Sequence, residues 1–200
     1  MLKTLITNNC WAGIIYNNYQ KEFCSPTINL QILPEEFPKF CGNLKHYLEQ
    51  EVIECKEPSE IHKNRLLRMF GYIPDYPMGL IDDIILVFQH YETFEDAKEK
   101  WETRKKRVDY DSIGYLFHVK HYVYSVSAVA FMALHLPNSV CITEDFGLEG
   151  AYRFDVPPGM DAFGGVRGED GNMRRIIEQN FKIKDWLEGK YETINNNPGL

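Results

Sequence analysis

A dense group of polar and reactive side chains follows the first apolar segment of the chain, in the string Asn8-Asn9-Cys10-Trp11-Ala12-Gly13. Residues 2–7 are short, apolar and β-prone, and we expect residues 11–19 to begin a helix. A thiolate at a helix N-terminus is stabilised and nucleophilic, so Cys10 is a candidate catalytic residue. Asn8, Asn9 and Trp11 are candidate substrate-binding residues. The structural alternative is an Asx turn at the asparagines, with Cys10 as a small buried side chain.

A second candidate catalytic residue is His90, which comes directly after the apolar run of residues 84–88. Such a run is typical of a strand that is covered on both faces. Ligands of open α/β sheets bind outside the carboxyl ends of the strands. If this strand is parallel to that of residues 2–7, His90 faces the same crevice as Cys10, as a general base, and Tyr91 offers a sugar an aromatic face. The structural alternative is a histidine that binds a backbone carbonyl or caps the next helix.

Two arginines near the end of a predicted helix, residues 93–107, are candidate ligands for an anion. Arg104 falls on the same helix face as Trp101, and Arg107 belongs to a basic end that complements the helix dipole. The planar guanidinium binds phosphate or carboxylate, so both are candidate substrate-binding residues. For Arg104 the structural alternative is a side chain that covers apolar surface.

Other motifs point to no metal and no cofactor. The glycine-rich residues 164–171 lack the Lys-Ser/Thr ending of a P-loop and the spacing of a dinucleotide-binding fingerprint, so a surface loop is expected. The five cysteines include no Cys-x-x-Cys pair, and His118 and His121 do not have the spacing of a zinc site.

The composition excludes several classes of protein. The 200 residues carry 22 Lys+Arg and 29 Asp+Glu, so the formal net charge of 22 − 29 = −7 argues against nucleic-acid binding. Hydrophobic residues make up 44% of the chain, which suits a globular domain with its own core. No apolar run approaches 18 residues and no signal-peptide pattern is present, so we expect a cytoplasmic protein with reduced thiols and no transmembrane segment. The oligomeric state is not indicated.

Predicted strands alternate with predicted helices, which indicates an α/β fold of three layers, with a mostly parallel or mixed sheet flanked by helices. We expect one domain over residues 1–190 and a flexible tail over residues 191–200. Residues 56–79 are the least regular, with a short helix at 61–70. The predicted strands are residues 2–7, 28–33, 84–88, 113–119, 140–143 and 152–154, and the predicted helices are residues 11–19, 34–48, 93–107, 125–136 and 172–181.

Several short strings follow one another along the chain: Ile6-Thr7-Asn8-Asn9-Cys10-Trp11-Ala12-Gly13, Ser25-Pro26-Thr27, Leu33-Pro34-Glu35-Glu36-Phe37, Tyr76-Pro77-Met78-Gly79, His90-Tyr91 and Ala97-x-x-Lys100-Trp101-x-x-Arg104-x-x-Arg107. In this order they resemble a bacterial family of unknown function, some members of which are named exopolysaccharide biosynthesis proteins. The resemblance covers most of residues 5–145, and Ala12 stands where a second glycine is expected. It implies an α/β fold and a link to capsule or exopolysaccharide assembly, and some members carry the label acetyltransferase.

Two classes of function are compatible with these residues. The first is an acyl or glycosyl transferase that acts on a sugar or activated sugar, with Cys10 or a hydroxyl as nucleophile and His90 as base. The alternative is a non-catalytic module that binds a glycan or a sugar nucleotide in polysaccharide assembly. A thiol hydrolase shares the Cys10 and His90 pair but lacks a clear third residue to orient the histidine.

Overall fold

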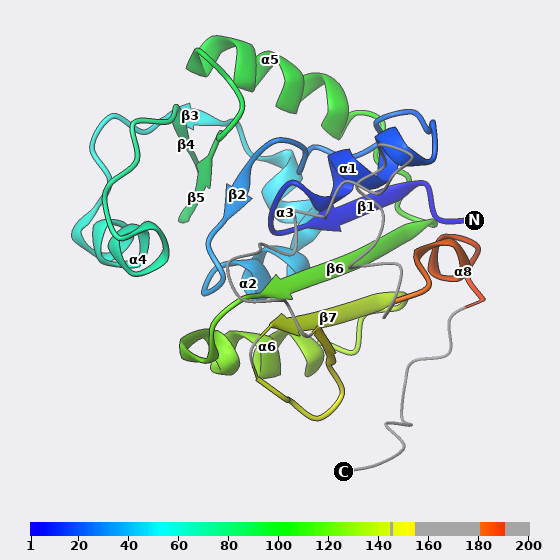
Figure 1. Cartoon of the computed structure of the whole chain (residues 1–200). Coiled ribbons are helices and arrows are strands. Elements are labelled where there is room, and N and C mark those ends of the chain that lie inside the picture. Colours follow the sequence, from blue (N-terminus) through cyan, green and yellow to red (C-terminus); the bar gives the residue numbers. More distant parts are fainter. Residues whose placement is uncertain (145, 155–180, 191–200) are drawn as a thin grey trace, which may run out of the picture.

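The computed structural model describes residues 1–144, 146–154 and 181–190, and its α/β class confirms the prediction (Figure 1). The main sheet has four parallel strands in the order β1-β6-β7-β8. These strands are β1 (Thr4–Thr7), β6 (Ile113–Val119), β7 (Ser139–Glu144) and β8 (Tyr152–Phe154). The predicted loop at residues 164–171, most of the predicted helix at 172–181 and the predicted tail lie outside the described residues.

The central strand β6 is buried along its whole length because both faces of the sheet are covered. On one face, Phe117 packs against Phe37 of α2 (Phe37–Gly42) and Phe131 of α6 (Ser125–Met132). On the other face, Leu116 belongs to the core formed with α1 (Trp11–Asn18) and α8 (Ile183–Leu187). Side chains alternate between the two faces of a strand, so β6 contributes to two separate cores.

A second sheet, antiparallel, stands beside the main sheet in the order β2-β5-β4-β3 (Figure 1). The predicted double coverage of residues 84–88 is confirmed, since Ile84 and Leu86 join the main core while Ile85 and Val87 join a smaller one. This strand nevertheless pairs in an antiparallel hairpin and not in the parallel sheet. The strands are β2 (Gln31–Ile32), β3 (Ile53–Glu54), β4 (Met78–Ile81) and β5 (Ile84–Val87).

The remaining helices largely follow their sequence signals. Helix α4 (Glu60–Phe70) begins at Ser59, whose hydroxyl accepts from the His62 N–H, and ends at Gly71, which has a φ of 78°. Helix α5 (Phe94–Lys105) begins at Thr93, whose side chain accepts from the Asp96 N–H as its capping sequence predicts. The single predicted helix of residues 34–48 is instead two, α2 and α3 (Leu44–Glu49), because the chain leaves helical geometry at Asn43.

Two further features bear on the environment of the chain. All five cysteines are free thiols. Among the helices that the structure describes, none combines the length and the apolar character that crossing a bilayer requires.

One buried carboxylate, Glu36, contacts both α4 and the second sheet and so connects them. Its Oε1 lies 2.7 Å from Nη1 of Arg65 and 3.1 Å from Nε2 of His62. Its Oε2 accepts a hydrogen bond from the Ile85 N–H at 2.9 Å. The hydrogen bond to Glu36 raises the pKa of His62. The charged form of His62 is therefore favoured in the folded protein.

This contact predicts a pH-dependent part of the stability. The pKa of His62 is higher in the folded protein than in the unfolded chain, where it is about 6.5. The contribution of His62 to the free energy of unfolding is therefore fully present below pH 6.5, and it is lost as the pH rises through the pKa of the folded state. We expect the difference in melting temperature between the wild type and His62→Gln to be larger at pH 5.5 than at pH 8.5. The exposed His46, replaced in the same way, is the control. Equal differences for His62→Gln at both pH values would contradict this assignment.

A second stability prediction concerns Gly114, the second residue of β6. A Cβ at this position would lie 2.7 Å from Leu2 Cδ1 and 2.7 Å from Trp186 Cζ2, too close for real contacts. We expect Gly114→Ala to lower the free energy of unfolding by about 1–3 kcal/mol, measured by urea denaturation. Gly147→Ala is the control, because a Cβ there meets nothing within 4 Å. Equal stabilities of the two variants would show that α8 does not pack closely against β6.

Candidate functional site

The site begins where β1 and β6 end, side by side, at Asn8. The Asn8 side chain donates from Nδ2 to the His118 carbonyl at 3.0 Å and accepts the His118 N–H at Oδ1, also at 3.0 Å. Its amide therefore takes the place of a further residue in the ladder between the two strands. This role uses both polar groups of the side chain.

Asn9 organises the start of α1. Its Oδ1 accepts the Trp11 N–H at 3.2 Å, which is the Asx turn of the structural alternative. Thr7 Oγ1 accepts the Ala12 N–H at 3.2 Å and donates to the Asn9 carbonyl at 2.6 Å. The N–H groups of Trp11 and Ala12 are thus satisfied by side chains of the same turn.

A buried imidazole, His118, connects two strands and the start of a helix. Its Nδ1 lies 3.3 Å from the indole Nε1 of Trp11 and 3.2 Å from Nδ2 of Asn9. An indole nitrogen only donates, so Nδ1 accepts and the proton resides on Nε2, which lies 2.6 Å from Oε1 of Glu144. The side chains of His118 and Glu144 are 1% and 6% exposed. Trp11, His118 and Glu144, which we call the buried triad, therefore join β7, β6 and the start of α1.

The roles of His118 and Glu144 are not among the sequence predictions. In the sequence, His118 stands out only through its spacing from His121, and Glu144 belongs to no motif. A signal was available, since both residues lie at or beside the carboxyl ends of neighbouring parallel strands. The same rule that drew attention to Asn8 applies to them.

A pocket of about 440 Å³ opens at these strand ends, and we call it the amide pocket. Both candidate catalytic residues, Cys10 and His90, line it. His90 reaches it from the loop after β5, which belongs to the antiparallel sheet, and not from a strand parallel to β1. Among the described residues that line the pocket there is no carboxylate. They are Asn8, Asn9, Cys10, Ile14, Gln31, Pro34, Met69, Phe70, Gln89, His90, His118, Lys120, His121 and Tyr124.

The environment of Cys10 favours its protonated form. Burial raises the pKa of its thiol to about 11. Its Sγ lies 3.7 Å from Oε1 of Gln89, to which it donates a weak hydrogen bond. At neutral pH the thiol is therefore a hydrogen-bond donor that helps to orient the Gln89 amide.

The remaining predicted binding residues lie outside the amide pocket. Trp11 is fully buried in the triad. Arg104 donates from Nη1 to the Tyr91 hydroxyl at 2.7 Å, and that hydroxyl donates to the Ile28 carbonyl at 3.2 Å. Arg107 donates from Nη1 to the Phe23 carbonyl at 3.3 Å. These contacts tie α5 to the segment after α1, and the structure does not bring either arginine together with Cys10 and His90.

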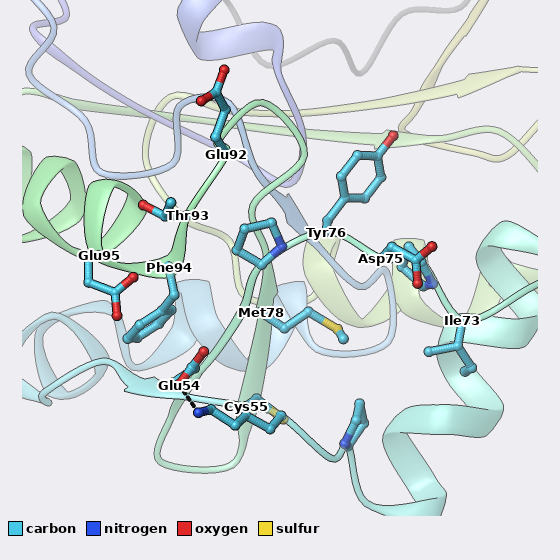
Figure 2. A pocket seen from close by; sticks show the side chains of 14 residues that line it. Glu54, Cys55, Ile73, Asp75, Tyr76, Met78, Glu92, Thr93, Phe94 and Glu95 are labelled. Atoms are coloured by element: carbon cyan, nitrogen blue, oxygen red, sulfur yellow. Dashed lines mark ion pairs between the residues drawn. The ribbon is translucent and has the colours of Figure 1, made fainter.

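A second and larger hollow, of about 600 Å³, lies beside β3 and β4 (Figure 2). Met78 and Phe94 stand near its centre, with Glu92 and Glu95 on one side and Tyr76 on the other. None of the candidate residues from the sequence lines it. The amide pocket is therefore the candidate functional site.

Comparison with known families gives one decisive match. A family model described as a domain of unknown function, DUF1919, matches residues 2–149. The chain belongs to this family. The DUF1919 match contains every residue that lines the amide pocket, together with the buried triad.

The chain is also similar to an uncharacterized protein of Haemophilus influenzae. The two are 26% identical over 140 residues, which is 70% of this chain and 61% of the relative. The match therefore spans less than two thirds of the length of that relative, and the name of the relative gives no activity.

The protonated state of Cys10 is directly testable. We expect alkylation of Cys10 by iodoacetamide, followed by peptide mass spectrometry, to increase with pH up to about pH 11, since burial raises its pKa to about 11. At pH 8 an unperturbed cysteine peptide in the same tube should react at least about tenfold faster. A Cys10 rate that is already at its plateau at pH 7 would show a stabilised thiolate.

Proposed function

We propose that this protein binds a sugar or an activated sugar in the amide pocket and transfers an acyl or glycosyl group in exopolysaccharide or capsule assembly. The link to polysaccharide assembly rests on the resemblance of its sequence strings. The nature of the ligand rests on the chemistry of the pocket wall.

The observation that carries the proposal is the pair of glutamine amides in the pocket. Gln31 uses its Nε2 to donate to the Ile32 carbonyl at 2.6 Å, which leaves Oε1 for a ligand. Gln89 uses its Oε1 to accept from Cys10, which leaves Nε2. One acceptor and one donor match a sugar hydroxyl, which both donates and accepts. Apolar side chains of Ile14 and Phe70 line the same pocket and can cover the C–H groups of a sugar ring.

The volume of the pocket is consistent with this class of ligand. Pockets for small molecules generally measure about 300–1,000 Å³ and combine apolar walls with a few polar groups. At about 440 Å³, the amide pocket has room for a sugar with an activating group.

In the transferase that we propose, His90 is the general base. His90 lines the pocket at an exposed position, where an acceptor can reach it. It takes the proton of an acceptor hydroxyl as the oxygen forms its bond to the acyl or anomeric carbon. The bond from that carbon to the leaving group breaks, and the leaving group departs with the electron pair. Transfer is direct, because the pKa of about 11 makes Cys10 a poor nucleophile at neutral pH.

A non-catalytic binding module is the second candidate, and one observation favours it. Two enclosed titratable groups of the site, Cys10 and His118, are engaged in contacts within the protein. A binding module needs only the amides and the apolar wall, and no reactive group.

Replacement of His90 separates the two functions. We expect His90→Ala to lower turnover of an acetyl-coenzyme A or nucleotide-sugar donor by about 100-fold or more, while the affinity for the sugar ligand changes little. Product formation by mass spectrometry and binding by calorimetry are the measurements, and His46→Gln, on the exposed side of α3, is the control. Turnover that His90→Ala leaves unchanged would contradict the transferase, and binding by a wild type without turnover would favour the module.

A further inference from the structure

We infer that the segment from Lys120 to Tyr124 forms an anion subsite of the amide pocket and holds a phosphate group of the sugar ligand. This inference deepens the proposed function and rests on it, because both use the same pocket. The segment directly follows β6, and Lys120, His121 and Tyr124 line the pocket.

The first observation is the hydroxyl of Tyr124. Tyr124 is 3% exposed, and its hydroxyl is buried with no hydrogen-bond partner among the described residues. A buried polar group without a partner destabilises the folded protein. Tyr124 lines the amide pocket, and a ligand oxygen that reaches its hydroxyl would supply the missing partner.

The second observation is the protonation state of that hydroxyl. The pKa of Tyr124 is raised to about 12, chiefly by burial and also by the charge of Glu35, against a lowering by the charge of Arg68. Glu35 and Arg68 pair with each other at 2.9 Å, so their charges partly compensate. Tyr124 is therefore a neutral phenol that can donate a hydrogen bond, and a charged acceptor makes the stronger bond.

The third observation is the charge of the wall. Although the whole chain has a formal charge of −7, the described lining of the pocket contains an ammonium group, Lys120, and the imidazole of His121 beside Tyr124, and it contains no carboxylate. A carboxylate in this wall would repel an anion. The wall therefore suits a negatively charged ligand better than the rest of the acidic protein does.

A phosphate ester suits the chemistry of these groups. Its oxygens point in several directions and can accept from an ammonium, an imidazole and a phenol at the same time. Activated sugars carry such a group, either as a sugar phosphate or as the diphosphate of a nucleotide sugar. The subsite also replaces Arg104 and Arg107 as the anion ligands of the site, since neither arginine lines the pocket.

Binding of four probes at constant ionic strength tests the subsite. The probes are inorganic phosphate, glucose 1-phosphate, UDP-glucose and glucose, measured by calorimetry. We expect the wild type to bind inorganic phosphate, and to bind glucose 1-phosphate or UDP-glucose about tenfold or more tightly than glucose. The stronger of these two phosphorylated probes distinguishes a sugar phosphate from a nucleotide sugar as the source of the phosphate.

Two variants assign the effect to the segment. Tyr124→Phe should weaken binding of the phosphorylated probe about tenfold, while the melting temperature of the ligand-free protein stays the same or rises, because an unpartnered hydroxyl is removed. Tyr122→Phe, two residues away and exposed, is the matched control. Lys120→Gln should weaken the phosphorylated probe but not glucose, with Lys100→Gln on α5 as its control.

The outcomes separate this inference from the proposed function. If glucose binds as tightly as the phosphorylated probes, or if inorganic phosphate does not bind, the subsite is wrong while sugar binding in the pocket stands. A Tyr124→Phe variant that loses thermal stability and keeps its affinity also overturns the subsite, since the hydroxyl then serves the fold. If none of the four probes binds, the proposed function fails as well.

Discussion

Trp11, His118 and Glu144 connect the start of α1 with two strands of the main sheet through a single imidazole ring. The indole donates to Nδ1, so the ring is the tautomer that carries its proton on Nε2, which lies 2.6 Å from Oε1 of Glu144. Asn8 aligns the backbone of the same histidine with the end of β1. Part of the wall of the amide pocket depends on this arrangement, since Asn8, Asn9 and His118 all line the pocket. Such fixed residues hold in place the neighbouring side chains that can contact a ligand.

The pocket illustrates how an acidic protein can present a site for an anion. Glu144 lies close to the pocket but points its charge at His118, and Glu35 pairs with Arg68. These two carboxylates are therefore each engaged by another side chain of the protein. The described pocket wall itself carries amides, imidazoles, a phenol and an ammonium group. Net charge is a poor guide to the ligand of an individual pocket, because local groups dominate at short distance.

Much of the architecture was predictable because buried strands leave long apolar runs. Strand β6 and the doubly covered β5 are such runs, and the capping residue Thr93 marks the start of α5. The hairpin between β4 and β5 was not predictable in the same way. Strand β4 is short and contains Gly79. The turn that follows it needs a positive φ of 55° at Asp82, and the sequence alone does not show that this residue adopts a left-handed conformation. The antiparallel pairing follows from this turn.

The candidate site was predictable in position but not in its contacts. The rule that ligands bind at strand ends led to Asn8, Asn9, Cys10 and His90, which all line one pocket. Trp11 donates a hydrogen bond to His118, and Arg104 donates one to Tyr91. The spacing of these residues in the sequence does not indicate either contact. The direct test of the account is the ¹H–¹⁵N spectrum of the protein during titration with UDP-glucose. We predict that the side-chain amide signals of Gln31 and Gln89 shift with saturation, whereas shifts confined to residues around Tyr76 and Phe94 would place the ligand in the other hollow and contradict the account.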